Sequence, residues 1–497
     1  MSKIKRPTYI VEVPLRTTES DKRNLSIRLN AARNLYNACL GELLSRMSRM
    51  KADPDYDIAR AMPKGDAKRE LFAATAIRHG FTKTSSDAFA IKTKNACWIG
   101  DHLGAHETQK TGEKAFNAVK EHSLGKRGRP RFKPYNRLHS IEGKSNAAGI
   151  RWREGKIEWG ILSLQGILPP KGKDPWLESA LEGKVKYCRV IHRHVKGDDR
   201  WSVQLMMDGT APRKTKHNTP NAVVGLDVGP STIAAVGENK ALLEKLCAAL
   251  EQPWKESRRV LRAMDRSRRA TNPGNYNPDG TFKTGPKKWI RSEGYKKQKD
   301  KLSEIERRLA DERKRSHGEL ANKILSLGKQ VKTERLSYIS FQKNYGRSVK
   351  VRSPGMLVST IKRKAESAGG SMDEFPTRTT KLSQTCHCGL VVRKPLSLRT
   401  HECPCGVGPV QRDLYSGFLA RHVKNDKLDH AGAERSWPGA EPLLKMAWSS
   451  FNESASGRRI SASPRRKAPE PIAIERERAK RHEAPHAPDT VRVPIAS

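Results

Sequence analysis

The chain has 497 residues, and its 97 Lys and Arg side chains outnumber 53 Asp and Glu, which gives a net charge of +44 and a pI near 10.2. Self-repulsion of this size calls for a polyanionic partner, and the chain is long for a ribosomal or chromatin protein that only coats nucleic acid, since it can hold roughly two to four domains. Because no apolar run approaches the roughly 20 residues of a membrane span and the N-terminus lacks a signal-peptide core, we expect no membrane partner and a cytoplasmic location in a prokaryote.

The N-terminal quarter is predicted to be one strand followed by helices. Residues 1–16 alternate loosely between polar and apolar side chains, as a strand does. Over residues 21–50 the apolar spacing becomes helical, and helical segments with polar breaks continue to about residue 124. The stripe of the first helix consists of Leu25, Leu29, Ala32, Tyr36 and Leu40.

Residues 125–209 carry β signals. The predicted elements are a hairpin at 151–157 and strands at 185–195 and 201–207. His192 and His194 share one face of the first of these strands. We expect them to face solvent or RNA, with a metal role as the alternative.

The second half is predicted to contain a new domain, a basic helical region and a tail. Residues 221–237 hold the first strand of that domain and its turn. Residues 254–326 are strongly basic and mostly helical, interrupted by an Asn- and Gly-rich stretch, and their charge suits either a solvated face or a surface that follows a nucleic-acid backbone. From residue 432 the chain is rich in Pro, Ala, Arg and Glu, so residues 432–497 are expected to be a disordered basic tail.

Four of the eight cysteines form two tight pairs about fifteen residues apart, each followed by Gly: Cys386, Cys388, Cys403 and Cys405. Paired thiolates of this kind predict a structural four-sulfur Zn²⁺ site, although one-residue spacing within each pair is shorter than usual. His387 or His401 replacing a thiolate, and a redox dithiol, are the alternatives. The other four cysteines are scattered, as expected for thiols in a reducing compartment.

Three acidic residues occupy distinct local settings. Asp227 ends an apolar strand, Glu334 follows the basic helical stretch, and Asp413 begins a helix just past the cysteines. Taken singly, they suit a hairpin Asp, a surface Glu and a helix cap. A chain this cationic has little reason to gather carboxylates unless they bind cations, and three carboxylates can hold two Mg²⁺ ions about 4 Å apart, an arrangement that hydrolyses phosphodiesters.

The order of these motifs resembles TnpB and the compact type V CRISPR effectors derived from it. The likeness begins with Gly225-Leu226-Asp227-Val228-Gly229, continues with Glu334 and the cysteine pairs, and ends with Arg412-Asp413. It covers roughly residues 5–425. Further segments that resemble the family are Ala32-Arg33-Asn34-Leu35-Tyr36-Asn37, Gly128-Arg129-Pro130-Arg131-Phe132-Lys133, Trp201-Ser202-Val203 and Ser383-Gln384-Thr385-Cys386.

The resemblance implies a multidomain α+β chain built around a RuvC-type RNase H fold, which is a mixed sheet flanked by helices. The implied divisions are a wedge β-barrel (1–20 and 126–220), a helical recognition domain (21–125), a RuvC-like nuclease (221–380 and 409–431) and a zinc ribbon (381–408), followed by the tail.

The family's activity is RNA-guided cleavage of double-stranded DNA. By resemblance, Asp227, Glu334 and Asp413 bind two catalytic Mg²⁺ ions and the cysteines bind one Zn²⁺. The implied partners are a guide RNA, target DNA and the RNA–DNA heteroduplex, with one monomer per RNA expected and a dimer left open. The expected nucleic-acid contacts are Arg33, Arg131, Lys133 and Gln384.

The chain departs from the family pattern around the third acid. Gln411 stands where an acid is usual, and Tyr415 and Ser416 replace Asn and a small residue. Polar Lys332 and Thr333 precede Glu334. These departures leave open an RNA-guided effector that binds DNA with weak or no cleavage. A transposon-associated TnpB nuclease is a second alternative, and a transposase or resolvase is a third that the RNA-binding segments disfavour.

Overall fold

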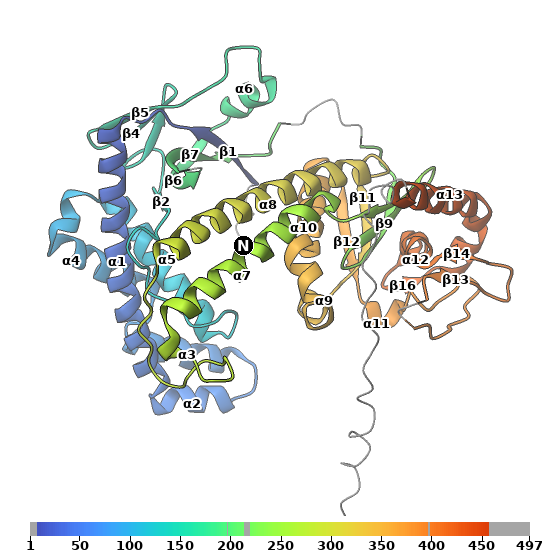
Figure 1. Cartoon of the computed structure of the whole chain (residues 1–497), viewed down its shortest axis with the longest axis horizontal. Coiled ribbons are helices and arrows are strands. Elements are labelled where there is room, and N and C mark those ends of the chain that lie inside the picture. The colour runs from blue at the N-terminus through green and yellow to red at the C-terminus, as the bar shows by residue number, and fades with distance from the viewer. Residues whose placement is uncertain (1–6, 196, 213–218, 396–397, 457–497) are drawn as a thin grey trace, which may run out of the picture.

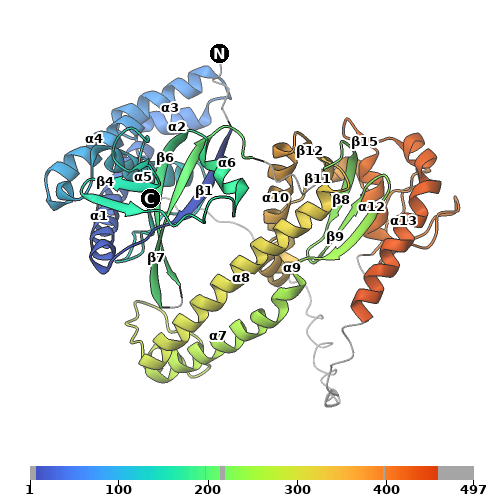
Figure 2. The ribbon, with the colours of Figure 1, turned by 90° about the horizontal axis from the view of Figure 1, so that it is seen from above.

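The computed structural model describes residues 7–195, 197–212, 219–395 and 398–456. It is a mixed α/β chain with several sheets, and Figure 1 shows two lobes, formed by residues 7–212 and 219–456. Figure 2 shows two long helices of the second lobe, α7 (Glu251–Thr271) and α8 (Glu293–Leu325), extending from that lobe alongside the first lobe. In the described part of the chain, no helix combines the length and the apolar character that crossing a membrane requires.

The first lobe contains two antiparallel sheets. One has the strand order β1-β7-β6-β2 and the other β3-β4-β5, and a bridge between Leu15 and Gly166 connects them. The elements are β1 (Thr8–Pro14), β2 (Ser140–Glu142), β3 (Arg151–Arg153), β4 (Lys156–Trp159), β5 (Leu162–Gln165), α6 (Pro175–Leu181), β6 (Val185–Val195) and β7 (Asp198–Asp208). The predicted hairpin and strand pair are confirmed, while closure into a wedge barrel stays a prediction.

Helices complete the first lobe. They are α1 (Glu19–Lys51), α2 (Pro54–Ala61), α3 (Asp66–Arg78), α4 (Lys83–Asn95), the 3₁₀ turn η1 (Trp98–Asp101) and α5 (Ala105–Ser123). A capping box starts α1: the Thr18 hydroxyl accepts from the Asp21 amide, and the Asp21 carboxylate accepts from the Thr18 amide. The predicted apolar stripe of α1 is buried in one core that includes residues of both sheets, which confirms the helix prediction.

A five-stranded mixed sheet organises the second lobe, in the order β10-β9-β8-β11-β12. Its strands are β8 (Val223–Val228), β9 (Thr232–Val236), β10 (Ala241–Lys245), β11 (Gln330–Glu334) and β12 (Ser371–Phe375). The first three strands in chain order form an antiparallel meander, whereas β11 runs parallel to both β8 and β12. The sheet therefore brings the ends of β8 and β11 to the same edge.

Two different sets of helices cover the two faces of this sheet. On β9, Ile233 and Ala235 point into one core, and Ala234 and Val236 point into the other. The first core includes α8 (Glu293–Leu325) and α10 (Pro354–Ser367), and the second includes α12 (Arg412–Arg421) and α13 (His430–Ser456). The remaining helices are η2 (Ala248–Leu250), α7 (Glu251–Thr271), η3 (Pro273–Asn275), α9 (Tyr338–Arg352) and α11 (Thr377–Thr380).

The cysteine region lies between β12 and α12 and is built from short strands. These are β13 (Thr400–His401) and β14 (Val410–Gln411), and β15 (Val423–Lys424) pairs with β16 (Lys427–Leu428) after α12. Because β14 runs directly into α12, the cysteine region is fixed to the start of that helix.

The prediction of disorder from residue 432 is wrong for residues 432–456, which belong to α13. The helix is stable because its small and apolar side chains are buried against the second core, in which Ala433, Ala440, Leu444 and Ala447 take part. Tertiary burial outweighs a local composition that includes Pro438 and Pro442 within the helix. The rest of the predicted tail, residues 457–497, lies outside the described residues.

Candidate functional site

Asp227 and Glu334 lie at the ends of two neighbouring parallel strands. The last paired residues of β8 and β11 are Leu226 and Thr333, and the two acids directly follow them. The buried Thr333 hydroxyl donates to the Leu226 carbonyl at 3.4 Å. The polar residue before Glu334 thus ties the two strands together next to the acids.

Asp413 reaches this edge from α12, which packs directly on β8. A Cβ atom on Gly225 would lie 2.0 Å from the Gly417 carbonyl oxygen, so only glycine permits this contact. Asp227 is two residues beyond Gly225 and therefore projects from the same face of the sheet, toward α12. Asp413 is in the first turn of that helix.

The residue that caps the N-terminus of α12 is not Asp413, the residue that the sequence suggested as a helix cap. Asp413 was one candidate cap, but the N-cap residue is Gln411, whose side-chain oxygen accepts from the Leu414 amide at 2.7 Å. Gln411 also pairs with Thr400 in the β13–β14 ribbon. Gln411 therefore has a structural role, and the Asp413 carboxylate is left outside the cap.

The environment of the acids disfavours their ionised forms. Burial raises the pKa of Asp227 well above its ordinary value, and the neighbouring Asp413 and Glu334 raise it further. Burial also raises the pKa of Glu334 to about 7, although hydrogen bonds with Leu382 and Thr380 oppose the shift. Carboxyls with pKa values raised by burial and like charge are typical of functional sites that bind cations.

The three acids are spaced more widely than the ligands of a single small ion. Among the described residues, the group of candidate ligands whose atoms all lie within 4.8 Å of one another consists of cysteines and does not include these acids. The three carboxylates, as the described residues place them, therefore do not surround one common ion position.

Two arginines adjoin the acids. Arg399 Nη1 lies 3.7 Å from Asp413 Oδ1, and Arg412 and Arg399 both lower the pKa of Asp227, though less than burial raises it. Arg412 is buried, its amide donates to the Arg399 carbonyl at 2.8 Å, and its Nη1 donates to the Pro395 carbonyl at 3.0 Å. The acids thus have fixed cationic neighbours on the side of the cysteine region.

The four predicted cysteines come together. The Sγ atoms of Cys386 and Cys405, and those of Cys388 and Cys403, are each 3.6 Å apart, and all four lie within 4.8 Å of one another. Sulfurs about 2.3 Å from a tetrahedral Zn²⁺ stand about 3.8 Å apart, so the donor set fits zinc. Burial raises the pKa of the Cys386 thiol to about 12, a cost that a bound cation removes by stabilising the thiolate.

The two histidines proposed as alternative ligands contact Tyr415 of α12. His387 Nδ1 is 3.0 Å from the Tyr415 hydroxyl oxygen, and the His401 ring stacks on the Tyr415 ring with centroids 4.1 Å apart. Tyr415 also approaches Cys386, with its hydroxyl oxygen 3.2 Å from Sγ. The histidines therefore belong to the packing around the cluster, and the tight group contains cysteines alone.

Three of the four predicted nucleic-acid contacts gather between α1 and the loop that precedes β2. The Arg33 guanidinium lies 5.5 Å from the centre of the Tyr135 ring. Asn37 holds the Lys133 backbone through two hydrogen bonds, and Arg131 is exposed. These residues form one surface of the first lobe.

Sequence reasoning placed Gln384 in the same group, but Gln384 lies in the cysteine region. It did not single out Thr380 and Leu382, which contact Glu334, or Arg399 and Arg412. A usable signal existed for the first two, because they immediately precede the Ser383-Gln384 motif.

His192 and His194 bracket Asp199 at the tip of the β6–β7 hairpin, and each has a ring nitrogen 2.9 Å from Asp199 Oδ1. They do not form a tight metal-ligand group within the described residues. Both line a groove of about 1010 Å³ between the first lobe and α8.

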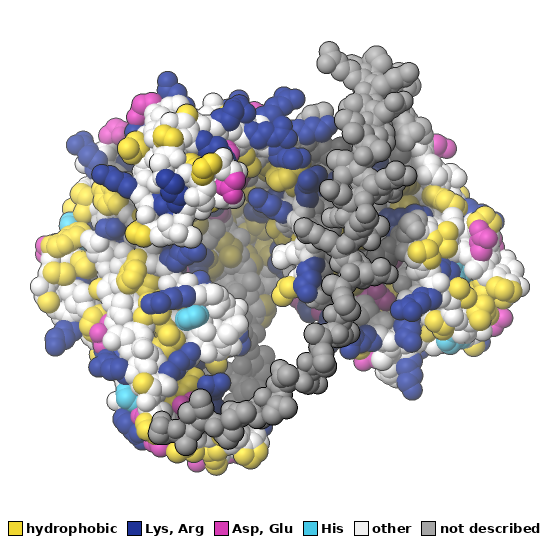
Figure 3. Space-filling view, turned by 60° about the horizontal axis from the view of Figure 1, so that its bottom comes forward, with side chains coloured by type: hydrophobic (Ala, Val, Ile, Leu, Met, Phe, Trp, Pro, Cys, Tyr) yellow, Lys and Arg dark blue, Asp and Glu magenta, His cyan; other side chains and the backbone are white. Residues whose placement is uncertain are grey.

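Lys and Arg side chains lie on both halves of the face shown in Figure 3.

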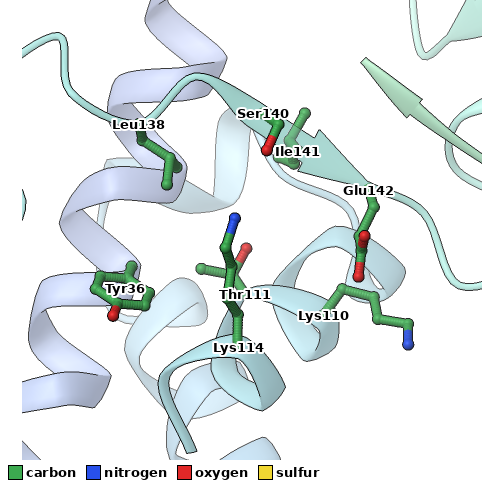
Figure 4. Close-up of a pocket in the computed structure, with 8 residues that line it drawn as sticks. All are labelled: Tyr36, Lys110, Thr111, Lys114, Leu138, Ser140, Ile141 and Glu142. Atoms are coloured by element: carbon green, nitrogen blue, oxygen red, sulfur yellow. The ribbon is translucent and has the colours of Figure 1, made fainter. Parts of the chain in front are cut away.

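A small cavity between α1, α5 and β2 carries no site. It holds about 20 Å³, enough for one water molecule and too little for a nucleotide. Figure 4 shows Lys114 extending into it from α5. The lining residues are Tyr36, Lys110, Thr111, Lys114, Leu138, Ser140, Ile141 and Glu142.

Comparison with known proteins finds structural similarity at low sequence identity. No protein-family model and no curated protein matches the chain. The chain is similar to a solved structure described as the cryo-EM structure of the Cas12f1-sgRNA-target DNA complex, with 12% identity, a TM-score of 0.44, and 84% of this chain and 98% of that chain covered. It is also similar to one described as the cryo-EM structure of a CRISPR-Cas12f ternary complex, with 14% identity, a TM-score of 0.28 and 82% of each chain covered. At these values, the functional conclusion rests on the site residues.

Proposed function

We propose that the protein is an RNA-guided DNA endonuclease that pairs a guide RNA with target DNA beside a short flanking motif and cleaves both strands at one RuvC-like site. The observation that carries the proposal is the approach of Asp227, Glu334 and Asp413 at one edge of the sheet, where burial and mutual repulsion raise the pKa of Asp227. In a chain with a net charge of +44, such a gathering of acids is explained by cations bound between them.

The chemistry follows from the residues at this edge. Asp227, Glu334 and Asp413 would hold two Mg²⁺ ions, which would supply an activated water and neutralise the charge that develops on the phosphate. The three acids provide oxygen ligands from three separate elements, and the sheet and α12 fix their positions. Arg399 lies next to Asp413 and its side chain is half exposed, so it suits a phosphate oxygen of the bound strand. No side chain need act as a general base.

The fold agrees with this chemistry. An antiparallel meander followed by parallel β11 and β12, with helices on both faces, supports the RNase H-type part of the proposal. Base pairing would read the target sequence, so the protein itself needs only shape recognition, positive charge and recognition of the short flanking motif. Arg33, Arg131 and Lys133 on the first lobe suit backbone contacts to the guide.

The same proposal assigns Zn²⁺ to Cys386, Cys388, Cys403 and Cys405. A closed four-sulfur site leaves no ligand position for substrate, so its role is structural. It would hold the ribbon that carries Arg399 to the start of α12.

Plasmid cleavage by the protein with its co-purified RNA tests the proposal. Target plasmid is expected to be linearised in the presence of Mg²⁺, and Asp227→Ala is expected to abolish cutting while RNA and target binding persist. Asp57→Ala, which removes an exposed acid on α2, is the matched control. Cutting that survives Asp227→Ala contradicts the site assignment, and guided binding without cutting by the unaltered protein identifies a binding-only effector.

A further inference from the structure

The loop that joins α7 to α8, residues 272–292, forms a built structure at the tip of the helical pair. The Asn272 side chain donates to the Ile290 carbonyl at 2.9 Å and accepts from the Ile290 amide at 2.7 Å. The Asn275 side chain donates to the Lys288 carbonyl at 2.9 Å. These side-chain hydrogen bonds hold the first and last segments of the loop against each other. The surface residues of the tip therefore have a defined arrangement.

Three aromatic rings and two arginines make up the centre of this tip. Tyr276, Phe282 and Trp289 pack with ring centroids 5.1 to 6.0 Å apart. The Arg268 guanidinium lies 5.3 Å from the Phe282 ring centre and 5.5 Å from the Trp289 ring centre, and the Arg269 guanidinium lies 4.8 Å from that of Tyr276. Even so, 50% of Phe282 and 38% of Trp289 remain exposed. The tip thus keeps aromatic surface available although it has a small core of its own.

Further cations flank the aromatic residues in the sequence of the loop. Lys283, Lys288 and Arg291 are exposed, and their side chains make no hydrogen bond or ion pair within the described ranges. Asp279, the acid inside the loop, accepts hydrogen bonds from the Thr281 amide and hydroxyl. The Asp279 carboxylate is therefore engaged within the loop. The surface of the tip has a net positive charge and exposes aromatic rings between its cations.

We infer that this tip, residues 272–292, binds an unpaired segment of the guide RNA. The inference rests on the proposed RNA-guided function and adds a contact to it. Exposed aromatic rings stack on bases that are free of a duplex, and the neighbouring cations contact the phosphates of the same strand. RNA presents unpaired loops and ends to such platforms, whereas duplex DNA shields its base faces.

The place of the tip in the fold favours RNA over DNA. It lies at the end of the α7–α8 pair that points away from the β8–β12 sheet (Figures 1 and 2). A DNA strand undergoing cleavage must reach Asp227 and Asp413 at that sheet, at the other end of the helical pair. The part of the guide outside the heteroduplex has no such constraint.

The salt dependence of RNA binding tests the cationic part of the inference. The probe is the RNA that co-purifies with the full-length protein, end-labelled and titrated against RNA-free protein at several salt concentrations. The triple variant Lys283→Glu, Lys288→Glu and Arg291→Glu removes three phosphate contacts, so the slope of log K against log salt is expected to become less negative by about 2. The matched control reverses three exposed cations of the second lobe, Lys240, Lys427 and Arg435, and is expected to leave the slope within about 0.5 of wild type. Equal slopes for the tip variant and wild type overturn the inference.

Photocrosslinking tests the aromatic part and separates RNA from DNA. With p-benzoylphenylalanine in place of Phe282, the complex assembled with target DNA is expected to give a crosslink that RNase removes and DNase leaves intact. The same replacement of Ile339, which is 75% exposed on α9, is the control for a random exposed position. A crosslink to DNA, or none above the control, overturns the inference. Neither measurement requires cleavage, so a complex that crosslinks RNA but cuts no DNA contradicts the nuclease proposal alone.

Discussion

The Tyr415 hydroxyl oxygen lies 3.2 Å from Cys386 Sγ, and Tyr415 is two residues beyond Asp413 on the same helix. The hydroxyl also accepts a hydrogen bond from the His387 amide at 3.0 Å. Tyr415 therefore joins the cysteine cluster to the helix that carries the third acid. The order of the cluster and the position of Asp413 are physically linked.

This contact predicts that Tyr415→Phe weakens the proposed zinc site. In the proposed zinc site the hydroxyl would stabilise the Cys386 thiolate, and loss of such an outer partner typically lowers metal affinity about 10- to 100-fold. The measurement is competition for zinc between the protein and a chromophoric chelator. Tyr56→Phe, which alters a partly buried tyrosine on α2 of the first lobe, serves as the control. Equal zinc affinity in Tyr415→Phe and wild type would show that the hydroxyl does not support the cluster.

The crowding of acids predicts that Asp227→Asn stabilises the protein when Mg²⁺ is absent. The folded pKa of Asp227 is raised, so its ionised form destabilises the fold, and this cost appears as pH rises above the unfolded pKa of about 4. The free energy of unfolding is expected to rise by about 1 to 2 kcal/mol at pH 8, and by less at pH 5. Thermal unfolding in magnesium-free buffer measures the effect.

The effect of Mg²⁺ on the melting temperature is a second measurement of the crowding of acids around Asp227. Mg²⁺ is expected to raise the melting temperature of the wild type more than that of Asp227→Asn, because the variant lacks one ligand and part of the repulsion. Asp57→Asn is the exposed control and is expected to behave as wild type. A variant that is less stable than wild type in magnesium-free buffer at pH 8 would speak against a strained cluster of acids.

His422, at the end of α12, predicts a loss of stability in acid. Burial, then the charge of Arg421, lowers its pKa to about 4, with smaller contributions from Lys332 and Lys424, while Asp429 acts in the opposite direction. The unfolded histidine binds a proton below about pH 6.5, whereas the folded one resists it, so stability falls between pH 6.5 and 4 by up to about 3 kcal/mol.

The slope of stability against pH checks this assignment. His422→Gln is expected to flatten the slope between pH 6.5 and 4, whatever the variant's absolute stability. Met446→Ala, at an exposed position of α13, removes no titrating group and is expected to keep the wild-type slope. Parallel slopes for His422→Gln and wild type would assign the acid sensitivity to other groups.

The strands and helices that follow simple periodicity were predictable, and so was the strand that carries Asp227. Its apolar run and the turn that follows are local signals, and the structure confirms them as the antiparallel strands β8 and β9. The approach of Asp413 was not predictable from spacing alone, because it depends on the contact between Gly225 and Gly417, which are far apart in sequence. The link between Tyr415 and Cys386 likewise joins separate elements. Charge and metal chemistry, and then the resemblance to a family, grouped the three acids in advance, but nothing in the sequence joined Tyr415 to Cys386.

The C-terminal helix shows where composition misled the prediction, and it supports a test. Leu444 of α13 is fully buried among side chains of α12 and the sheet, in a segment that its Pro and Ala content suggested to be disordered. Leu444→Ala is therefore expected to lower the free energy of unfolding by about 2 to 5 kcal/mol, since it leaves a cavity in a packed core. Met446, two residues on, is 65% exposed, and Met446→Ala is expected to change it by less than about 0.5 kcal/mol. Denaturant unfolding of the two variants distinguishes a docked helix from a loose tail, because in a loose tail both substitutions would be equally harmless.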